Sequence, residues 1–389
     1  MTHTSNKIYD FHFWLVCLSA LLFFASFNML IPELPAYLTQ LGGADYKGLI
    51  ISLFTVTAML SRPFSGKLAD KMGRIPVMIF GCSVCLICSL VYPMLTSIYG
   101  FFLLRFVHGF STGFTPTGQA AYLSDVIPAH KRGEAMGYLG TAGALGSASG
   151  PAIGGLVALE FGLNTMFYLS SFFALLSIII LINTQETLKD KNRFRPSMLK
   201  VSGADIFESR VLAPCLVMVL SAYAYGAVFT LIPDFGAHVG IKNKGLLFTY
   251  LTVASLLVRL IAGKASDRYG RVPVLRLSTF LIIISMVIIG LSDTQFMLIV
   301  GITLYGFAQG MTSPTLLAWA TDLSDEHHKG RGVASLYIFM EMGIGLGAIF
   351  SGWLYANDSS NFFFTFIVCS ALAFLAFSYL TLKPLLAKV

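Results

Sequence analysis

The sequence predicts an all-α integral membrane protein with twelve transmembrane helices in two six-helix, pseudo-symmetric halves. Three observations support this prediction. Only 12% of the 389 residues are charged, whereas 56% are apolar, and this charged fraction is about half that of a typical soluble protein. The apolar residues form runs of about 20, the length that crosses a bilayer as a helix. The second half of the chain repeats motifs of the first.

Twelve apolar runs of spanning length follow one another along the chain. The first run is longer than the apolar region of a secretory signal peptide and lacks a small-residue cleavage site after it, so we expect it to be retained as a span. An even number of spans places both termini on one side of the membrane. The predicted spans cover residues 11–32, 46–66, 76–95, 98–122, 135–159, 163–183, 211–233, 245–263, 273–291, 295–320, 332–355 and 362–382.

A long polar stretch divides the chain near its midpoint. It runs from Gln185 to Arg210 and contains five basic residues before Arg210. We therefore expect an N-terminal six-helix half at 1–184, a cytoplasmic linker at 185–210 and a C-terminal six-helix half at 211–389.

The distribution of Lys and Arg predicts the orientation. Of 26 basic residues, 20 lie at the termini or around the connections that follow the even-numbered spans, while the other side holds only Lys47, Lys242 and Lys244. Basic residues favour cytoplasmic loops, so both termini are expected in the cytoplasm and the protein in the cell (inner) membrane. The net charge of +7 is then a topology signal, and a nucleic-acid partner is not expected.

Internal repetition is the most informative feature. The segment from Arg62 to Val77 recurs from Arg259 to Val274, at an offset of 197 residues, and Leu30-Ile31-Pro32-Glu33 recurs as Leu231-Ile232-Pro233-Asp234. So many matched positions indicate two parallel six-span repeats. Repeats of this kind, facing each other around a central site, describe a transporter in which one half rocks against the other.

The loop after the second span, Gly66-Lys67-Leu68-Ala69-Asp70-Lys71-Met72-Gly73-Arg74, resembles the signature loop of the major facilitator superfamily, and the resemblance covers the whole chain. Glycines permit tight bends, and Asp and Arg are suited to latch onto helix ends and to release when the halves rock. The basic residues could instead serve only as topology determinants. The predicted gating residues are Gly66, Asp70, Gly73, Arg74, Gly263, Asp267, Gly270 and Arg271.

Two further patterns resemble subfamilies. In span 4, Arg105 lies in a pattern that proton-coupled members share, which implies a role for it in proton transfer. His108 departs from the commoner Gln near this position, and it is either a proton relay or a packing residue. Span 5 matches the pattern of drug:proton antiporters. Its small residues permit close helix contacts, and in the family this helix packs between the halves. Its pattern residues are Gly146, Gly150, Pro151, Gly154 and Gly155.

Six charged residues lie within spans or at their edges, and proton coupling is to be sought among them. Glu341 lies about ten residues, or roughly 15 Å, into span 11, where an ionised carboxylate is costly unless it is paired or protonated. We expect Glu341 to take up the proton and Arg105 to adjust its proton affinity. Glu33 and Asp234, near the outer mouth, are further candidates or simply end their helices in solvent. The six are Glu33, Arg62, Arg105, Asp234, Arg259 and Glu341.

The expected cavity is largely apolar with a few polar points, which favours a hydrophobic or amphipathic solute over a sugar. Spans 1, 4, 7 and 10 line the cavity in the resembled family. In this chain they supply Asn28, Gln119, Tyr223, Tyr225, Gln309 and Trp319.

The sequence thus predicts a monomeric, proton-coupled exporter of a small lipophilic or amphipathic solute. Its partners are the solute, protons and the lipid bilayer, and its energy source is the proton gradient, without a cofactor or metal. The alternatives are a proton-coupled importer of a sugar, organic acid or peptide, and a lipid or siderophore exporter of the same fold. A membrane enzyme or channel is disfavoured because we find no catalytic, metal-ligand or phosphate-binding motif in a plausible context.

Overall fold

The computed structural model describes residues 9–128, 132–188, 191–199, 207–324 and 329–386, and these contain twelve long helices and one short one. The N-terminal half consists of α1 (Phe11–Leu30), the short α2 (Leu34–Gln40), α3 (Gly48–Met72), α4 (Arg74–Val91), α5 (Ile98–Val126), α6 (Arg132–Phe161) and α7 (Leu163–Ile182). The C-terminal half consists of α8 (Leu212–His238), α9 (Gly245–Tyr269), α10 (Arg271–Gly290), α11 (Gln295–Leu323), α12 (Lys329–Tyr355) and α13 (Phe362–Leu386).

Every predicted span corresponds to one long helix, so the predicted fold is confirmed. Ten helices of the described chain are long and apolar enough to cross a membrane, and α9 adds an eleventh if its segments on either side of a 44° bend are taken together. Several helices extend beyond the apolar runs that predicted them. For example, α3 continues to Met72 and α9 to Tyr269, because charged residues are tolerated in a helix once it leaves the hydrocarbon.

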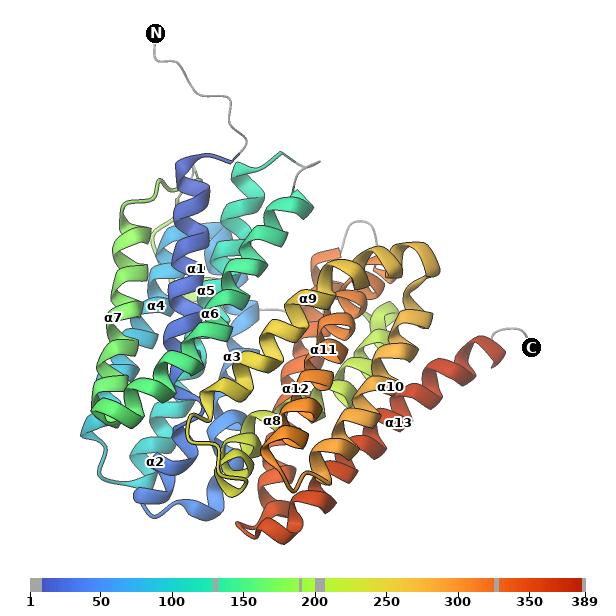
Figure 1. Ribbon diagram of the computed structural model, residues 1–389. Coiled ribbons are helices and arrows are strands. Elements are labelled where there is room, and N and C mark those ends of the chain that lie inside the picture. The colour runs from blue at the N-terminus through green and yellow to red at the C-terminus, as the bar shows by residue number, and fades with distance from the viewer. Residues whose placement is uncertain (1–8, 129–131, 189–190, 200–206, 325–328, 387–389) are drawn as a thin grey trace.

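The two halves stand side by side (Figure 1). They diverge toward the end of the bundle where α1 begins, which we call the terminal end, and approach each other at the opposite end, which we call the far end. Within each half the first helix packs along the fifth, α1 on α6 and α8 on α12. Between the halves, α6 packs on α9 and α12 on α3. Both sets of contacts repeat, which gives the structure its pseudo-symmetry.

Glycines permit the closest contacts between the halves at the far end. A Cβ atom at Gly48 of α3 would collide with the backbone of Ala348 in α12. Likewise, a Cβ atom at Gly245 of α9 would collide with the backbone of Pro151 in α6. The two contacts are related by the 197-residue offset. Only glycine lets the backbones come this close. The halves therefore meet at the far end through two equivalent glycine contacts.

The packing inside each half is apolar, and so is the outer surface. Phe23, Met78 and Cys82 belong to one buried cluster of the N-terminal half, and the C-terminal half has its own around Val228 and Phe366. Large apolar side chains also point outward, among them Leu103 at 66% exposure and Trp353 at 73%. Exposure of so many large apolar groups is costly in water and favourable in lipid, as expected for helices that span a membrane.

Candidate functional site

A cavity lies between the two halves and has two lobes. The first lobe is about 650 Å³ and the second about 590 Å³. Both are lined by Phe24 of α1, Tyr225 of α8 and Tyr337 of α12, so they are parts of one space. Their walls are mainly apolar, with a few polar side chains, which is the usual character of a small-molecule site.

An ion pair in the second lobe joins the two halves. Arg62 of α3 donates from Nη2 to Oε1 of Glu341 on α12 over 2.8 Å. The guanidinium also lies over the Tyr337 ring, 5.0 Å from its centre. Glu341 is only 7% exposed, and Arg62 offsets the cost of burying its carboxylate. The ion pair is therefore a direct polar contact between α3 and α12.

Arg62, and not Arg105, forms the ion pair with Glu341, and the predicted role of Arg105 in adjusting proton affinity stays a prediction. Although Arg105 borders the second lobe, its Nε donates to the carbonyl of Ile50 over 2.8 Å. Its guanidinium lies 4.6 Å from the centre of the Phe54 ring. Both contacts are made to α3, so the guanidinium of Arg105 binds within its own half.

His108 is fully buried between helices of the N-terminal half. Its Nδ1 is 3.4 Å from the Tyr92 hydroxyl, and its Nε2 is 3.5 Å from Sγ of Cys85. The residue is absent from the lining of both lobes. Its position therefore fits the packing alternative, and a proton-relay role stays a prediction.

Four of the six predicted cavity residues line the cavity: Asn28 in the second lobe, Gln119 and Gln309 in the first, and Tyr225 in both. Tyr223 and Trp319 are absent from the lining of both lobes and pack into buried apolar clusters, so a role in the cavity stays a prediction for them. Tyr223 and Tyr225 are two residues apart on α8 and so point about 200° apart around the helix.

Arg259 and Tyr337, which the sequence analysis did not assign to the cavity, also line it. Arg259 of α9 is the repeat equivalent of Arg62, and Nε of each arginine is buried without a hydrogen-bond partner among the described residues. The repeat offset was the signal that could have placed Arg259, because Arg62 and Arg259 occupy matching positions on matching helices.

Two further ion pairs cross between the halves at the far end. Lys47 of the N-terminal half contacts Asp234 of the C-terminal half, and Lys244 of the C-terminal half lies 3.7 Å from Glu33 of the N-terminal half. Burial raises the pKa of the Glu33 carboxyl above its usual range, and Lys244 offsets part of that rise. Both acids are thus held in contacts between the halves and do not end their helices in open solvent.

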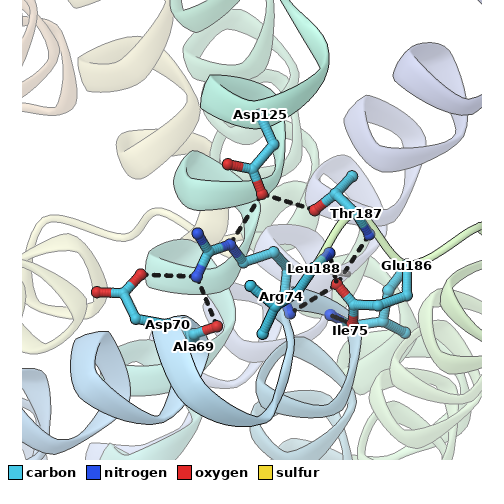
Figure 2. A network of polar contacts seen from close by, with 8 residues as sticks. All are labelled: Ala69, Asp70, Arg74, Ile75, Asp125, Glu186, Thr187 and Leu188. Carbon is cyan, nitrogen blue, oxygen red and sulfur yellow. Dashed lines mark hydrogen bonds and ion pairs between the residues drawn. The ribbon is translucent and has the colours of Figure 1, made fainter. Parts of the chain in front are cut away.

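The predicted gating loops form matching ion-pair clusters at the terminal end. Arg74 contacts Asp70 at 2.6 Å and Asp125 at the end of α5 at 3.0 Å (Figure 2). Arg271 contacts Asp267 at 2.5 Å and Asp322 at the end of α11 at 2.9 Å. In this conformation each ion-pair cluster therefore joins three helices of one half.

The four loop glycines have different roles. Gly73 and Gly270 have φ angles of +124° and +90°, which favour glycine, and each immediately precedes a helix. In contrast, a Cβ atom at Gly66 or Gly263 would meet no other atom within 4 Å. The sharp bends thus require glycine only at Gly73 and Gly270.

The glycines of α6 make two kinds of contact. Gly146, Gly150 and Gly154 lie against the backbone of α1 in the same half. Only the last of the series, Gly155, reaches across to Asn243 beside α9, whose Nδ2 donates to the carbonyl of Ala152 over 3.1 Å. The expectation that this helix packs between the halves holds for its far end, and most of its glycine face serves packing within the N-terminal half.

Comparison with known proteins identifies the family of this architecture. A sequence model described as Major Facilitator Superfamily matches residues 16–244 and 214–388. The multi-drug resistance efflux pump PmrA of Streptococcus pneumoniae is 27% identical over 84% of this chain and 83% of its own length. The multidrug resistance protein MdtG of Escherichia fergusonii is 25% identical over 95% of this chain and 93% of its own length.

A solved structure agrees in fold. The crystal structure of the human organic anion transporter MFSD10 (TETRAN) superposes with a TM-score of 0.73 over 95% of this chain and 98% of that chain. At 20% sequence identity this similarity concerns the arrangement of the helices alone.

Proposed function

The chain belongs to the Major Facilitator Superfamily, and from this premise we propose that it exports small lipophilic or amphipathic molecules across the cell membrane in exchange for protons. Relatives that match most of its length are named as multidrug efflux pumps. The apolar walls of the cavity support a solute of that character. No cofactor is part of this proposal, because the proton gradient supplies the energy.

The ion pair between Arg62 and Glu341 carries the proposal. It is the contact at which a proton can change how the two halves hold each other, because Arg62 belongs to α3 and Glu341 to α12. When Glu341 is ionised, the pair attracts the two helices. When Glu341 takes up a proton, Arg62 loses its partner and the electrostatic attraction between these helices falls.

Transport follows because the solute binds better when Glu341 is ionised and paired with Arg62, whereas a proton stabilises the unpaired state. With the cavity open to the cytoplasm, Glu341 releases its proton, pairs with Arg62 and the solute enters the apolar lobes. The loaded protein turns, and outside a proton neutralises Glu341 and weakens solute binding. The protonated, empty protein returns. Solute and proton are coupled because each binds one state of the pair better than the other.

The orientation belongs to the same proposal. The terminal end carries the Arg74 and Arg271 clusters and faces the cytoplasm, in agreement with the bias of basic residues. The far end faces outward and is closed by the glycine contacts and the ion pair between Lys47 and Asp234. The structure then corresponds to the state that receives solute from the cytoplasm.

Proton-driven dye transport in everted membrane vesicles tests this proposal. We expect vesicles with the intact protein to accumulate an amphipathic fluorescent dye when respiration acidifies their interior, and dye addition to release part of the pH gradient. Glu341→Gln is expected to abolish both signals at unchanged protein level. The matched control is Glu160→Gln, which makes the same change at an exposed position of α6.

Two results would contradict the proposal. If Glu341→Gln vesicles still accumulated dye in proportion to the pH gradient, Glu341 would not be the coupling group. If solute addition raised the pH gradient of everted vesicles, or alkalinised the medium of intact cells, protons and solute would move together and the protein would be an importer.

A further inference from the structure

One cation of the cavity lacks the partner that the symmetry of the fold leads one to expect. In the first lobe, Arg259 is the only charged residue among the lining residues of the described chain. No carboxylate of the described residues lies within ion-pair distance of it, and its Nε is buried without a hydrogen-bond partner. A cation in this setting is stabilised when an anion joins it.

The repeat shows where that anion is missing. Arg62 and Arg259 are equivalent positions of α3 and α9, and Arg62 pairs with Glu341 of α12. Subtracting the same 197 residues from 341 gives Ala144 of α6. The assignment holds structurally, since Gly343 packs on α8 as Gly146 packs on α1.

The wall around the equivalent position is built of small residues. Ala144 lines the first lobe together with Gly140 and Gly143. Nη1 of Arg259 lies 3.8 Å from where a Cβ atom at Gly140 would be. Arg259 of the C-terminal half thus points toward α6. At the position equivalent to Glu341, α6 has the small residue Ala144 and no carboxylate.

Two more polar groups in this lobe have no hydrogen-bond partner in the part of the chain that the structure describes. These are Nε2 of Gln119 and Oγ of Ser221, and both residues are 1% exposed and line the first lobe. A guanidinium, an amide N–H and a hydroxyl can all donate to oxygens that carry negative charge. The rest of the lining includes Phe24, Leu139, Leu256 and Leu317, which suits an apolar body.

We propose that the first lobe binds the oxyanion group of an amphipathic organic anion against Arg259, at the place where the repeat lacks a carboxylate. This inference rests on the proposed function, because it names the class of solute that the transporter carries. The solute supplies the negative charge to Arg259 that the Glu341 carboxylate supplies to Arg62. A carboxylate, sulfonate or phosphate group on an apolar body fulfils this requirement.

Binding of two probes that differ only in charge tests the proposal. The purified full chain in detergent is titrated with dansylaminoundecanoic acid and with its uncharged primary amide, and fluorescence reports the affinity of each. A charge-assisted hydrogen bond favours the acid by about 10- to 100-fold. We expect this preference in the intact protein, its loss in Arg259→Gln and its partial retention in Arg259→Lys.

Substitution of Ala144 tests the symmetry argument without removing the arginine. Ala144→Glu supplies the missing carboxylate within the protein, so it should abolish the preference for the acid. Ala144→Gln has nearly the same size without the charge and should preserve the preference. Arg193→Gln, which removes an exposed guanidinium in the linker, controls for unspecific attraction. This second position keeps the test valid if Arg259→Gln does not fold.

Equal affinity of the intact protein for acid and amide would overturn the inference, and so would an undiminished preference in Arg259→Gln or Ala144→Glu. These failures differ from failure of the proposed function. If the preference were absent while dye export still required Glu341, only the anion site would be wrong. If the preference were present while no proton-driven export occurred, only the transport mechanism would be wrong.

Discussion

Lys47 of the N-terminal half contacts Asp234 of the C-terminal half, and Lys244 and Glu33 repeat this contact with the donor and acceptor halves exchanged. Each half therefore contributes one cation and one anion to the far end. Reversing the charge of one member of a pair places two like charges together. Reversing both members of that pair restores the attraction. This relationship makes the closure testable one pair at a time.

The pair of Lys47 and Asp234 should control opening of the far end. A buried pair that loses one member costs about 3–5 kcal/mol, and because these side chains keep 11% and 16% exposure, we expect roughly 2 kcal/mol, or about 30-fold toward opening. Spin labels at Gln40→Cys and Lys242→Cys, both exposed at this end, should move apart in Lys47→Asp. The double variant with Asp234→Lys should restore the short distance, and a short distance in Lys47→Asp alone would show that the pair does not hold the end closed.

The pH should affect closure of the far end through Glu33. Burial raises its pKa more than Lys244 lowers it, so the closed far end favours the protonated Glu33 carboxyl over the ionised one. The contribution to closure is complete below the usual pKa of glutamate and is lost as the pH rises through the raised pKa. We expect alkaline medium to lengthen the same label distance. Glu33→Gln should remove this dependence, whereas Asp358→Asn, an exposed carboxyl whose pKa the Ser360 N–H holds below its usual range, should preserve it.

Arg62 and Glu341 should be strongly coupled in stability. Arg62→Gln leaves a buried carboxylate without its partner and should destabilise the protein by roughly 2–4 kcal/mol. The double variant with Glu341→Gln should be closer to the intact protein, because neither charge is then unpaired. Thermal unfolding in detergent, followed with a thiol-reactive dye, measures this because all six cysteines are buried. Additive losses in the two single variants would exclude a direct interaction.

The loop glycines should differ in their tolerance of alanine. Gly270→Ala forces an alanine into a backbone with φ of +90°, which should cost about 1–2 kcal/mol. Gly263→Ala adds a methyl group where no atom lies within 4 Å, and because it lies inside α9 it should gain up to about 1 kcal/mol of helix propensity. Thermal unfolding of the two variants should therefore shift in opposite directions, and equal shifts would contradict the assigned backbone role of Gly270.

The sequence was sufficient for features that depend on period and repetition. The twelve helices follow from the lengths of the apolar runs, and the matching Arg74 and Arg271 clusters follow from the repeat. It was insufficient where the rotation of a helix about its axis decides the outcome. The depth of Glu341 could be counted along the chain, but whether it faces Arg62 or Arg105 could not. For the same reason the sequence could not separate Tyr225, which faces the cavity, from Tyr223, which faces the core.

The linker has a consequence for the order in which the chain is made. Glu186 accepts hydrogen bonds from the N–H groups of Arg74 and Ile75 at the start of α4 (Figure 2), and Met198 packs into a cluster with Leu68. Glu186 and the described linker segment around Met198 thus pack on the N-terminal half. Synthesis of the first 199 residues completes that half before α8 exists, so a transporter made as two polypeptides should assemble when divided after Leu199 and lose the cap of α4 when divided before Glu186.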